Sequence, residues 1–253
     1  MCLIAFSYNS HPDYPLIFIS NRDEFYNRRS ASAHFWDDEK YLYGGKDLEE
    51  GGTWLGITST GKLAALTNYR DPSHLKNNAP TRGHLVTDFL YGNLTPNDYL
   101  DNLIPEADVY NGFNLLIYEA QKMYYFSNYE GIIRQLNPGV YALSNALLDT
   151  PWPKVEKLKK NFKAMISLPF QSLDFLKLLS DQDEAGDMQL PNTGLTYQQE
   201  KTLSSIFIRS TGYGTCCSSI VTVNNHNELI FTEKNYPVGG RNPSTHIQKI
   251  DLS

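Results

Sequence analysis

The chain has 253 residues, of which 41% are hydrophobic and 20% charged, and its formal net charge is −6 at pH 7. This composition is typical of a soluble globular protein, and we expect one domain over residues 1–253. The negative charge argues against a nucleic-acid partner, and no apolar stretch is long enough for an integral membrane segment. Because three cysteines make no disulfide framework, we expect a reducing, cytoplasmic location.

The first 25 residues predict a hairpin. Two apolar runs of strand length, residues 2–6 and 16–19, flank a turn that contains Asn9 and two prolines. If these runs pair antiparallel, Cys2 lies close to Arg22 and Asp23. The alternative interpretation is that Cys2 is a small hydrophobic residue in a buried strand, where free cysteine is often found.

Cys2 would carry a thiol and a free α-amine once Met1 is removed. The unperturbed pKa of an α-amine is about 7.7–8.0 and that of a thiol is about 8.5, so proton transfer between them costs little free energy. A carboxylate such as Asp23 favours the ammonium form, and the ammonium in turn favours the thiolate. This arrangement could attack a carbonyl carbon.

Residues 53–58 and 62–69 predict a second hairpin, whose later strand ends at Asn68. A side-chain amide at a strand end can donate to a tetrahedral oxyanion, although a turn-capping asparagine is the alternative. The glycine pairs at 44–45 and 51–52 lack the ending of a phosphate loop, and we expect a flexible loop over a pocket.

The remaining pattern alternates blocks of helices with blocks of strands, which favours an α+β fold. In the helix at 153–168, the lysines that lie between the apolar residues Val155 and Ile166 are expected to face solvent, and another strand ends at Asn145. Residues from Val238 onward show no clear pattern. We expect helices at 81–91, 95–103, 153–168 and 173–179, and strands at 113–120, 123–129, 132–136, 140–145, 206–209, 217–223 and 229–233.

Metal and cofactor sites are not indicated. The six histidines are scattered, and no His-Glu-x-x-His, Cys-x-x-Cys, Gly-x-Ser-x-Gly or dinucleotide-binding pattern occurs. We therefore expect neither a metal nor a cofactor.

Several motifs together resemble the NRDE family, which includes the transport and Golgi organisation protein 2 homologues. The initial Met-Cys is followed by the sequence NRDE at 21–24, and further blocks at 50–56, 61–69, 110–115, 143–148 and 212–215 run in the family's order. The resemblance implies a fold like that of N-terminal-nucleophile (Ntn) hydrolases, a four-layer αββα sandwich of two antiparallel sheets flanked by helices.

A more distant similarity is to the bile salt hydrolase and penicillin V acylase group. It implies that Cys2 is the nucleophile, Asp23 anchors its amine, and Asn68 and Asn145 build the oxyanion and substrate sites. Arg22 and Arg209 are the implied substrate-binding cations. The match is incomplete, since the acylases carry an arginine where this chain has Ser20. The NRDE family, for its part, usually has an arginine where this chain has Cys216.

Our principal hypothesis is an N-terminal-cysteine amidohydrolase that acts on a non-peptide linear amide through a thioester. The alternative is a non-catalytic protein on the same fold that binds a lipid, an acyl ligand or haem. The 17 tyrosines, 12 phenylalanines and 3 tryptophans would suit an apolar pocket, although most are expected in the core. An interaction scaffold is the third hypothesis, and no exposed apolar stripe supports it. The sequence does not indicate an oligomeric state.

Overall fold

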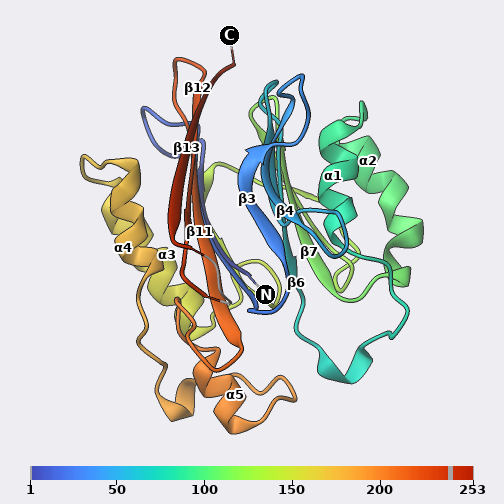
Figure 1. The fold of residues 1–253 in the computed structure, drawn as a ribbon, viewed down its shortest axis with the longest axis vertical. Coiled ribbons are helices and arrows are strands. Elements are labelled where there is room, and N and C mark those ends of the chain that lie inside the picture. The colour runs from blue at the N-terminus through green and yellow to red at the C-terminus, as the bar shows by residue number, and fades with distance from the viewer. Residues whose placement is uncertain (1, 239–241, 253) are drawn as a thin grey trace.

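The computed structural model describes residues 2–238 and 242–252, and it contains two antiparallel sheets that face each other (Figure 1). One sheet has the order β10-β1-β2-β11-β12-β13, and the other runs from β3 to β9 in sequence order. The first sheet comprises β10 (Gly139–Leu143), β1 (Cys2–Tyr8), β2 (Leu16–Phe25), β11 (Tyr213–Val223), β12 (Glu228–Asn235) and β13 (Ser244–Asp251). The second comprises β3 (Ser30–Phe35), β4 (Leu42–Asp47), β5 (Leu55–Thr58), β6 (Leu63–Asn68), β7 (Phe113–Glu119), β8 (Lys122–Ser127) and β9 (Arg134–Gln135).

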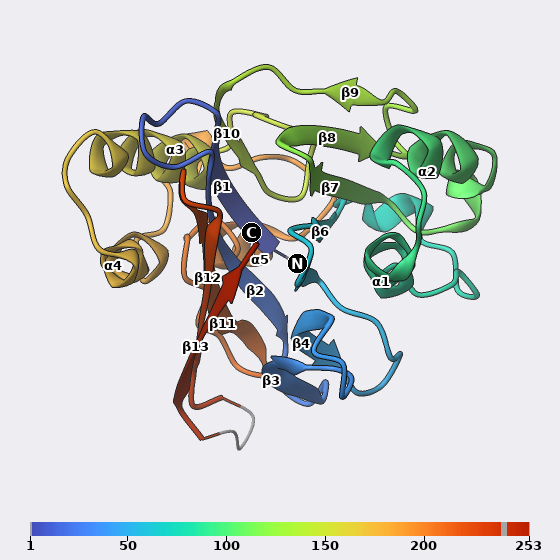
Figure 2. The same cartoon turned by 90° about the horizontal axis from the view of Figure 1, so that it is seen from above.

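Helices cover the outer face of each sheet, which makes the α+β sandwich that the sequence predicts (Figures 1 and 2). The helices are α1 (Gly83–Tyr91), α2 (Pro96–Leu103), α3 (Pro153–Ile166), α4 (Phe175–Leu179) and the short α5 (Tyr197–Thr202). Short 3₁₀ turns lie at Pro72–His74, Ile104–Val109, Ser172–Asp174 and Asp187–Gln189. In the described residues, no helix is long and apolar enough to cross a membrane.

Three apolar cores hold these layers together, and the alternation within β1 shows how. Ile4 and Phe6 point into the core between the sheets, whereas Leu3 and Ala5 point into the core under α3 and α4. Because successive side chains of a strand face opposite sides, a strand that is buried on both faces needs an unbroken apolar run. β1 is buried over its whole length, which explains the apolar run at residues 2–6.

The predicted first hairpin is confirmed. β1 and β2 pair antiparallel with Cys2 opposite Arg22 and Phe6 opposite Phe18, so the start of the chain lies against the end of β2. Directly opposed residues of an antiparallel pair place their side chains on the same face of the sheet. The Cys2 and Arg22 side chains therefore share one face.

The prediction of a flexible loop at 44–45 is wrong, because Gly44 and Gly45 lie inside β4. A Cβ atom at Gly44 would lie 2.6 Å from the Leu55 carbonyl oxygen, and one at Gly45 would lie 2.3 Å from the Trp54 ring. These glycines permit close packing and do not mark mobility. The predicted strand at 206–209 is also absent, and only an isolated bridge joins Arg209 to Gly214.

Candidate active site

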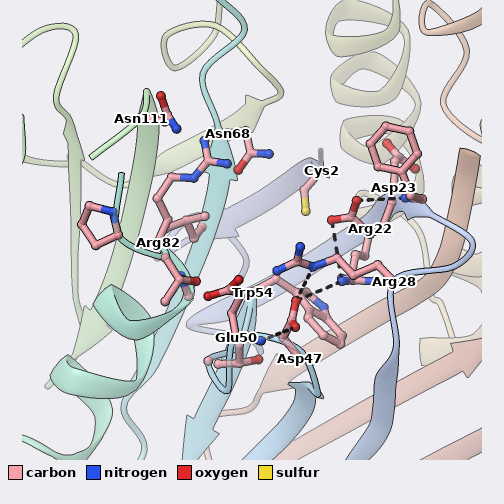
Figure 3. Close-up of a pocket in the computed structure, with 18 of the residues that line it drawn as sticks. Cys2, Arg22, Asp23, Arg28, Asp47, Glu50, Trp54, Asn68, Arg82 and Asn111 are labelled. Atoms are coloured by element: carbon pink, nitrogen blue, oxygen red, sulfur yellow. Dashed lines mark hydrogen bonds and ion pairs between the residues drawn. The ribbon is translucent and has the colours of Figure 1, made fainter. Parts of the chain in front are cut away.

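A polar pocket of about 390 Å³ opens where β1 and β2 meet the second sheet, and Cys2 lies in its wall (Figure 3). Its lining is rich in charged residues. The charged residues are Arg22, Asp23, Glu24, Arg28, Asp47, Glu50 and Arg82. We call this cavity the polar pocket.

Cys2 is placed by its strand pairing and is 8% exposed. Burial raises the pKa of the Cys2 thiol, and the positive charge of Arg22 opposes that rise. A buried thiol is therefore neutral at pH 7 unless a nearby group accepts its proton.

Asp23 is fully buried behind Cys2, at a bulge in the pairing of β2 with β11. The bulge lies between Thr215 and Cys217, and the Thr215 hydroxyl donates to Asp23 Oδ1 at 2.7 Å. Burial raises the pKa of the Asp23 carboxyl, and the positive charge of Lys154 opposes this rise. Bulges next to functional sites commonly change the direction of a side chain, and this bulge adjoins the Thr215 residue that hydrogen-bonds to Asp23.

Lys154 is a buried residue that the sequence pattern did not single out. It precedes the lysines that were predicted to face solvent, is 3% exposed and lies close enough to Asp23 to affect the pKa of the Asp23 carboxyl. Burial lowers the pKa of Lys154 to about 8, and Asp23 is the principal group that favours its charged form. The helical pattern did not reveal it, because Lys154 lies in the first turn of α3, ahead of the apolar positions that predicted the helix.

Arg22 precedes Asp23 in β2, so the two side chains leave opposite faces of the strand. Its guanidinium carbon stands 4.2 Å from the centroid of the Trp54 ring, and its Nη2 atom lies 3.8 Å from Glu24 and 3.7 Å from Asp47. Stacking on an aromatic face suits the planar guanidinium and fixes its orientation. Arg22 thus contributes a positive charge at a defined place beside the thiol (Figure 3).

The two predicted asparagines have different environments. Asn68 is half-buried and lines the polar pocket, so its side chain is available to a bound molecule. Asn145 is fully buried, and its Nδ2 atom donates to the Asn68 carbonyl oxygen at 2.9 Å. Asn145 thus positions the end of β6 and does not line the pocket.

Arg209 lies outside this constellation. Its side chain is exposed, and it is not among the residues that line the polar pocket. The structure therefore brings together Cys2, Arg22, Asp23 and Asn68, places Asn145 one layer behind them, and leaves Arg209 at the surface. The part of the chain that the structure describes contains no cluster of three or more His, Cys, Asp or Glu residues suited to a metal ion.

Arg82 also lines the polar pocket, and no sequence motif pointed to it. It precedes α1, and its Nη1 atom donates to the Gly112 carbonyl oxygen at 2.8 Å. Gly112 belongs to one of the family-like blocks, at 110–115. The sequence therefore marked the backbone to which Arg82 binds, but it did not mark Arg82 itself.

A second cavity of about 430 Å³ adjoins the polar pocket and is mostly apolar. The two cavities share Glu24, Phe25 and Asn68 in their walls. Leu195, Leu203 and Tyr213 line the second cavity, which we call the apolar cavity. A polar and an apolar compartment thus meet at Asn68.

Comparison with known proteins gives the family and the fold. Residues 1–237 match the family described as Transport and Golgi organisation 2. The chain is 38% identical to the Transport and Golgi organization protein 2 homologs of Bos taurus and of Homo sapiens, each alignment covering 92% of both chains. It is 29% identical to Transport and Golgi organization protein 2 of Drosophila melanogaster over 98% of both chains.

Two solved structures share the fold. A C2A mutant of conjugated bile acid hydrolase from Clostridium perfringens aligns with a TM-score of 0.52 and 11% identity, covering 99% of this chain and 92% of its own. A Caenorhabditis elegans ortholog of N-acylethanolamine-hydrolyzing acid amidase aligns with the same TM-score and identity over 87% and 92%. At this identity the likeness establishes the Ntn hydrolase-like sandwich alone.

Proposed function

We propose that this chain, which belongs to the Transport and Golgi organisation 2 family, is an amidohydrolase that uses Cys2 as an N-terminal nucleophile. The observation that carries the proposal is the position of Cys2 in the wall of a polar pocket, with buried Asp23 and pocket-facing Asn68 beside it. The solved neighbours are named as hydrolases of conjugated bile acid and of N-acylethanolamine, and both names support an amide substrate.

The proposed reaction has two halves. After Met1 is removed, the α-amine of Cys2 takes the thiol proton, and the thiolate attacks the amide carbonyl carbon. The carbon–nitrogen bond then breaks, the ammonium returns its proton to the leaving amine, and a thioester remains on Cys2. Water attacks the thioester with the amine as base, which releases a carboxylic acid and restores the thiol.

The surrounding residues have separate roles in this proposal. Asp23 holds the ammonium, and the Asn68 amide donates to the oxyanion of each tetrahedral intermediate. Arg22 favours the thiolate through its charge, and Asn145 acts only as a positioning residue for Asn68.

The test combines intact mass with kinetics. We expect purified protein to lack Met1 and to react first at Cys2 with limiting iodoacetamide, because the ammonium lowers the pKa of the Cys2 thiol. Cys2→Ala should abolish turnover of a panel of N-acyl amides, whereas the matched variant Cys217→Ala should retain it, since Cys217 is buried and does not line the pocket. Unchanged turnover in Cys2→Ala would contradict the proposal.

The apolar cavity favours one other function, which is binding of an acyl ligand without turnover. No histidine among the described residues lines either cavity, so Cys2 is the strongest ligand that they offer to haem iron. If Met1 is retained and Cys2 is unreactive, saturable binding of a fluorescent fatty acid would favour this function. Absence of saturation with both the fatty acid and haem would contradict it.

A further inference from the structure

We infer that Arg82 binds an anionic group on the amine half of the substrate, while the apolar cavity takes the acyl half. The substrate class is thus an apolar acyl group joined by an amide to a carboxylate-bearing amine, as in an N-acyl amino acid. This inference rests on the proposed function for its orientation, and it assigns the polar pocket a ligand chemistry that can be measured without turnover.

The first step is the pairing of the pocket's cations. Arg28 contacts Asp47 at 2.7 Å, and Arg22 lies 3.7 Å from the same carboxylate and 3.8 Å from Glu24. Arg82 has no ion pair with any carboxylate in residues 2–238 and 242–252. A half-buried guanidinium that lines a pocket without a counter-ion is suited to a ligand anion.

The second step is that the Arg82 side chain is held in place. Its bond to the Gly112 carbonyl oxygen uses Nη1, and that same oxygen also accepts from the Tyr69 amide at 2.9 Å. A Cβ atom at Gly112 would lie 2.6 Å from the Tyr129 ring and 2.9 Å from the Tyr69 Cβ, so the backbone here fits closely. Asn111 binds both backbone polar groups of Lys76, which fastens the loop that leads to Arg82.

The carboxylates of the pocket have to be weighed against this cation. Asp47 accepts from Arg28 and from the amides of Glu49 and Glu50, which satisfies its charge within the protein. Glu50 lines the pocket, but its side chain is exposed, so solvent screens it more than it screens Arg82. Glu24 lines both cavities, and its negative charge favours the charged form of Arg82, although no ion pair joins the two described side chains.

The third step gives the direction of the substrate. Cys2 and Arg82 line only the polar pocket, whereas Asn68 lines both cavities. A carbonyl at Cys2 and Asn68 would therefore have its apolar group beyond Asn68, against Leu195 and Leu203. The amine half stays in the polar pocket, where the Arg82 side chain extends towards Asn68 (Figure 3).

The test compares N-dodecanoylglycine with neutral N-dodecanoylglycinamide. A charge-assisted bond predicts that wild-type protein prefers the anionic compound by about 10- to 100-fold in kcat/KM. Arg82→Gln should remove this preference, and Arg82→Lys should restore part of it. Arg29→Gln removes an exposed arginine that does not line the pocket and should leave the preference unchanged. The circular dichroism spectrum of each variant serves as the control for folding.

Binding to Cys2→Ala, measured by calorimetry, separates this inference from the proposed hydrolysis. Tighter binding of the anionic compound, lost in Cys2→Ala with Arg82→Gln, supports the anion site even if wild-type protein never turns over. Equal affinity for both compounds, or a preference that persists without Arg82, overturns it even if hydrolysis is observed. Replacing hexanoyl by dodecanoyl should also tighten binding by about fourfold per methylene that becomes buried, and Leu195→Asp should reduce that gain.

Discussion

The polar pocket has two walls that are built in different ways. The sheet wall consists of Cys2, Arg22 and Asp23, which strand pairing holds in register. The loop wall consists of Asn68, the last residue of β6, and Arg82, which precedes α1. The Asn145 side chain donates to the Asn68 carbonyl oxygen, and the Arg82 side chain donates to the Gly112 carbonyl oxygen. Residues held by strand pairing at the centre of a sheet become mobile only when the sheet unfolds, whereas residues held by a few side-chain bonds can become mobile through local opening. Four substitutions test this difference between the two walls.

The largest effect is expected from Asn21→Leu in the sheet wall's own strand. Asn21 Nδ2 donates to the Leu179 and Ile206 carbonyl oxygens at 2.8 and 2.9 Å, and its Oδ1 accepts from Ser218. Loss of this buried network should lower the free energy of unfolding by about 3 kcal/mol. Urea denaturation measures the free energy of unfolding. A loss below about 1 kcal/mol would contradict a structural role for Asn21 of the NRDE motif.

Gly112→Ala should have the next largest effect, in the loop wall. The added methyl group meets the Tyr129 ring and the Tyr69 Cβ, so we expect a loss of about 1–3 kcal/mol from overpacking. Displacement of the Gly112 carbonyl should also weaken the anion preference that Arg82 provides. An unchanged preference would show that Arg82 does not depend on this anchor.

Lys154 gives a test by pH. The pKa of Lys154 falls from 10.5 to about 8 on burial, so between pH 8 and 10.5 this group binds more protons in the unfolded chain than in the folded one. Lys154 itself should then add up to about 1 kcal/mol of stability as the pH increases from 8 to 9. The cysteines act in the opposite direction over the same range, because a thiol in the unfolded chain titrates at about 8.5 and burial raises the pKa of Cys2 and of Cys217. Wild-type protein should therefore gain up to about 1 kcal/mol relative to Lys154→Met between pH 8 and 9, and urea midpoints of both proteins at pH 7.5, 8.5 and 9 would detect it.

Asn111→Ala should have the smallest effect on stability. Its two bonds to Lys76 are exposed, so we expect a loss of about 0.5–1 kcal/mol. Hydrogen exchange at the Lys76 amide should accelerate, while amides of β1 and β2 keep their protection. Equal acceleration in β1 would show that the two walls open together and not separately.

The sequence alone indicated much of the sheet wall. Strand periodicity and the position of NRDE at a strand end predicted that Cys2 would meet Arg22 and Asp23, and the pairing confirms this. Such predictions succeed because a hairpin's register depends on nearby residues and on side-chain alternation. The roles of Cys2, Asp23 and Asn68 in catalysis, the single domain and the cytoplasmic location remain predictions.

Only the tertiary structure decided the rest of the site. It placed Asn145 behind Asn68, left Arg209 at the surface, buried Lys154 beside Asp23 and brought Arg82 into the pocket. Each of these positions depends on contacts between segments far apart in the chain, such as the bond from Arg82 to Gly112. Local sequence determines which strands and helices form and which face of each is apolar, because those depend on neighbouring residues. Which charged side chains end up sharing one pocket depends on how the layers pack, and no local pattern encodes that.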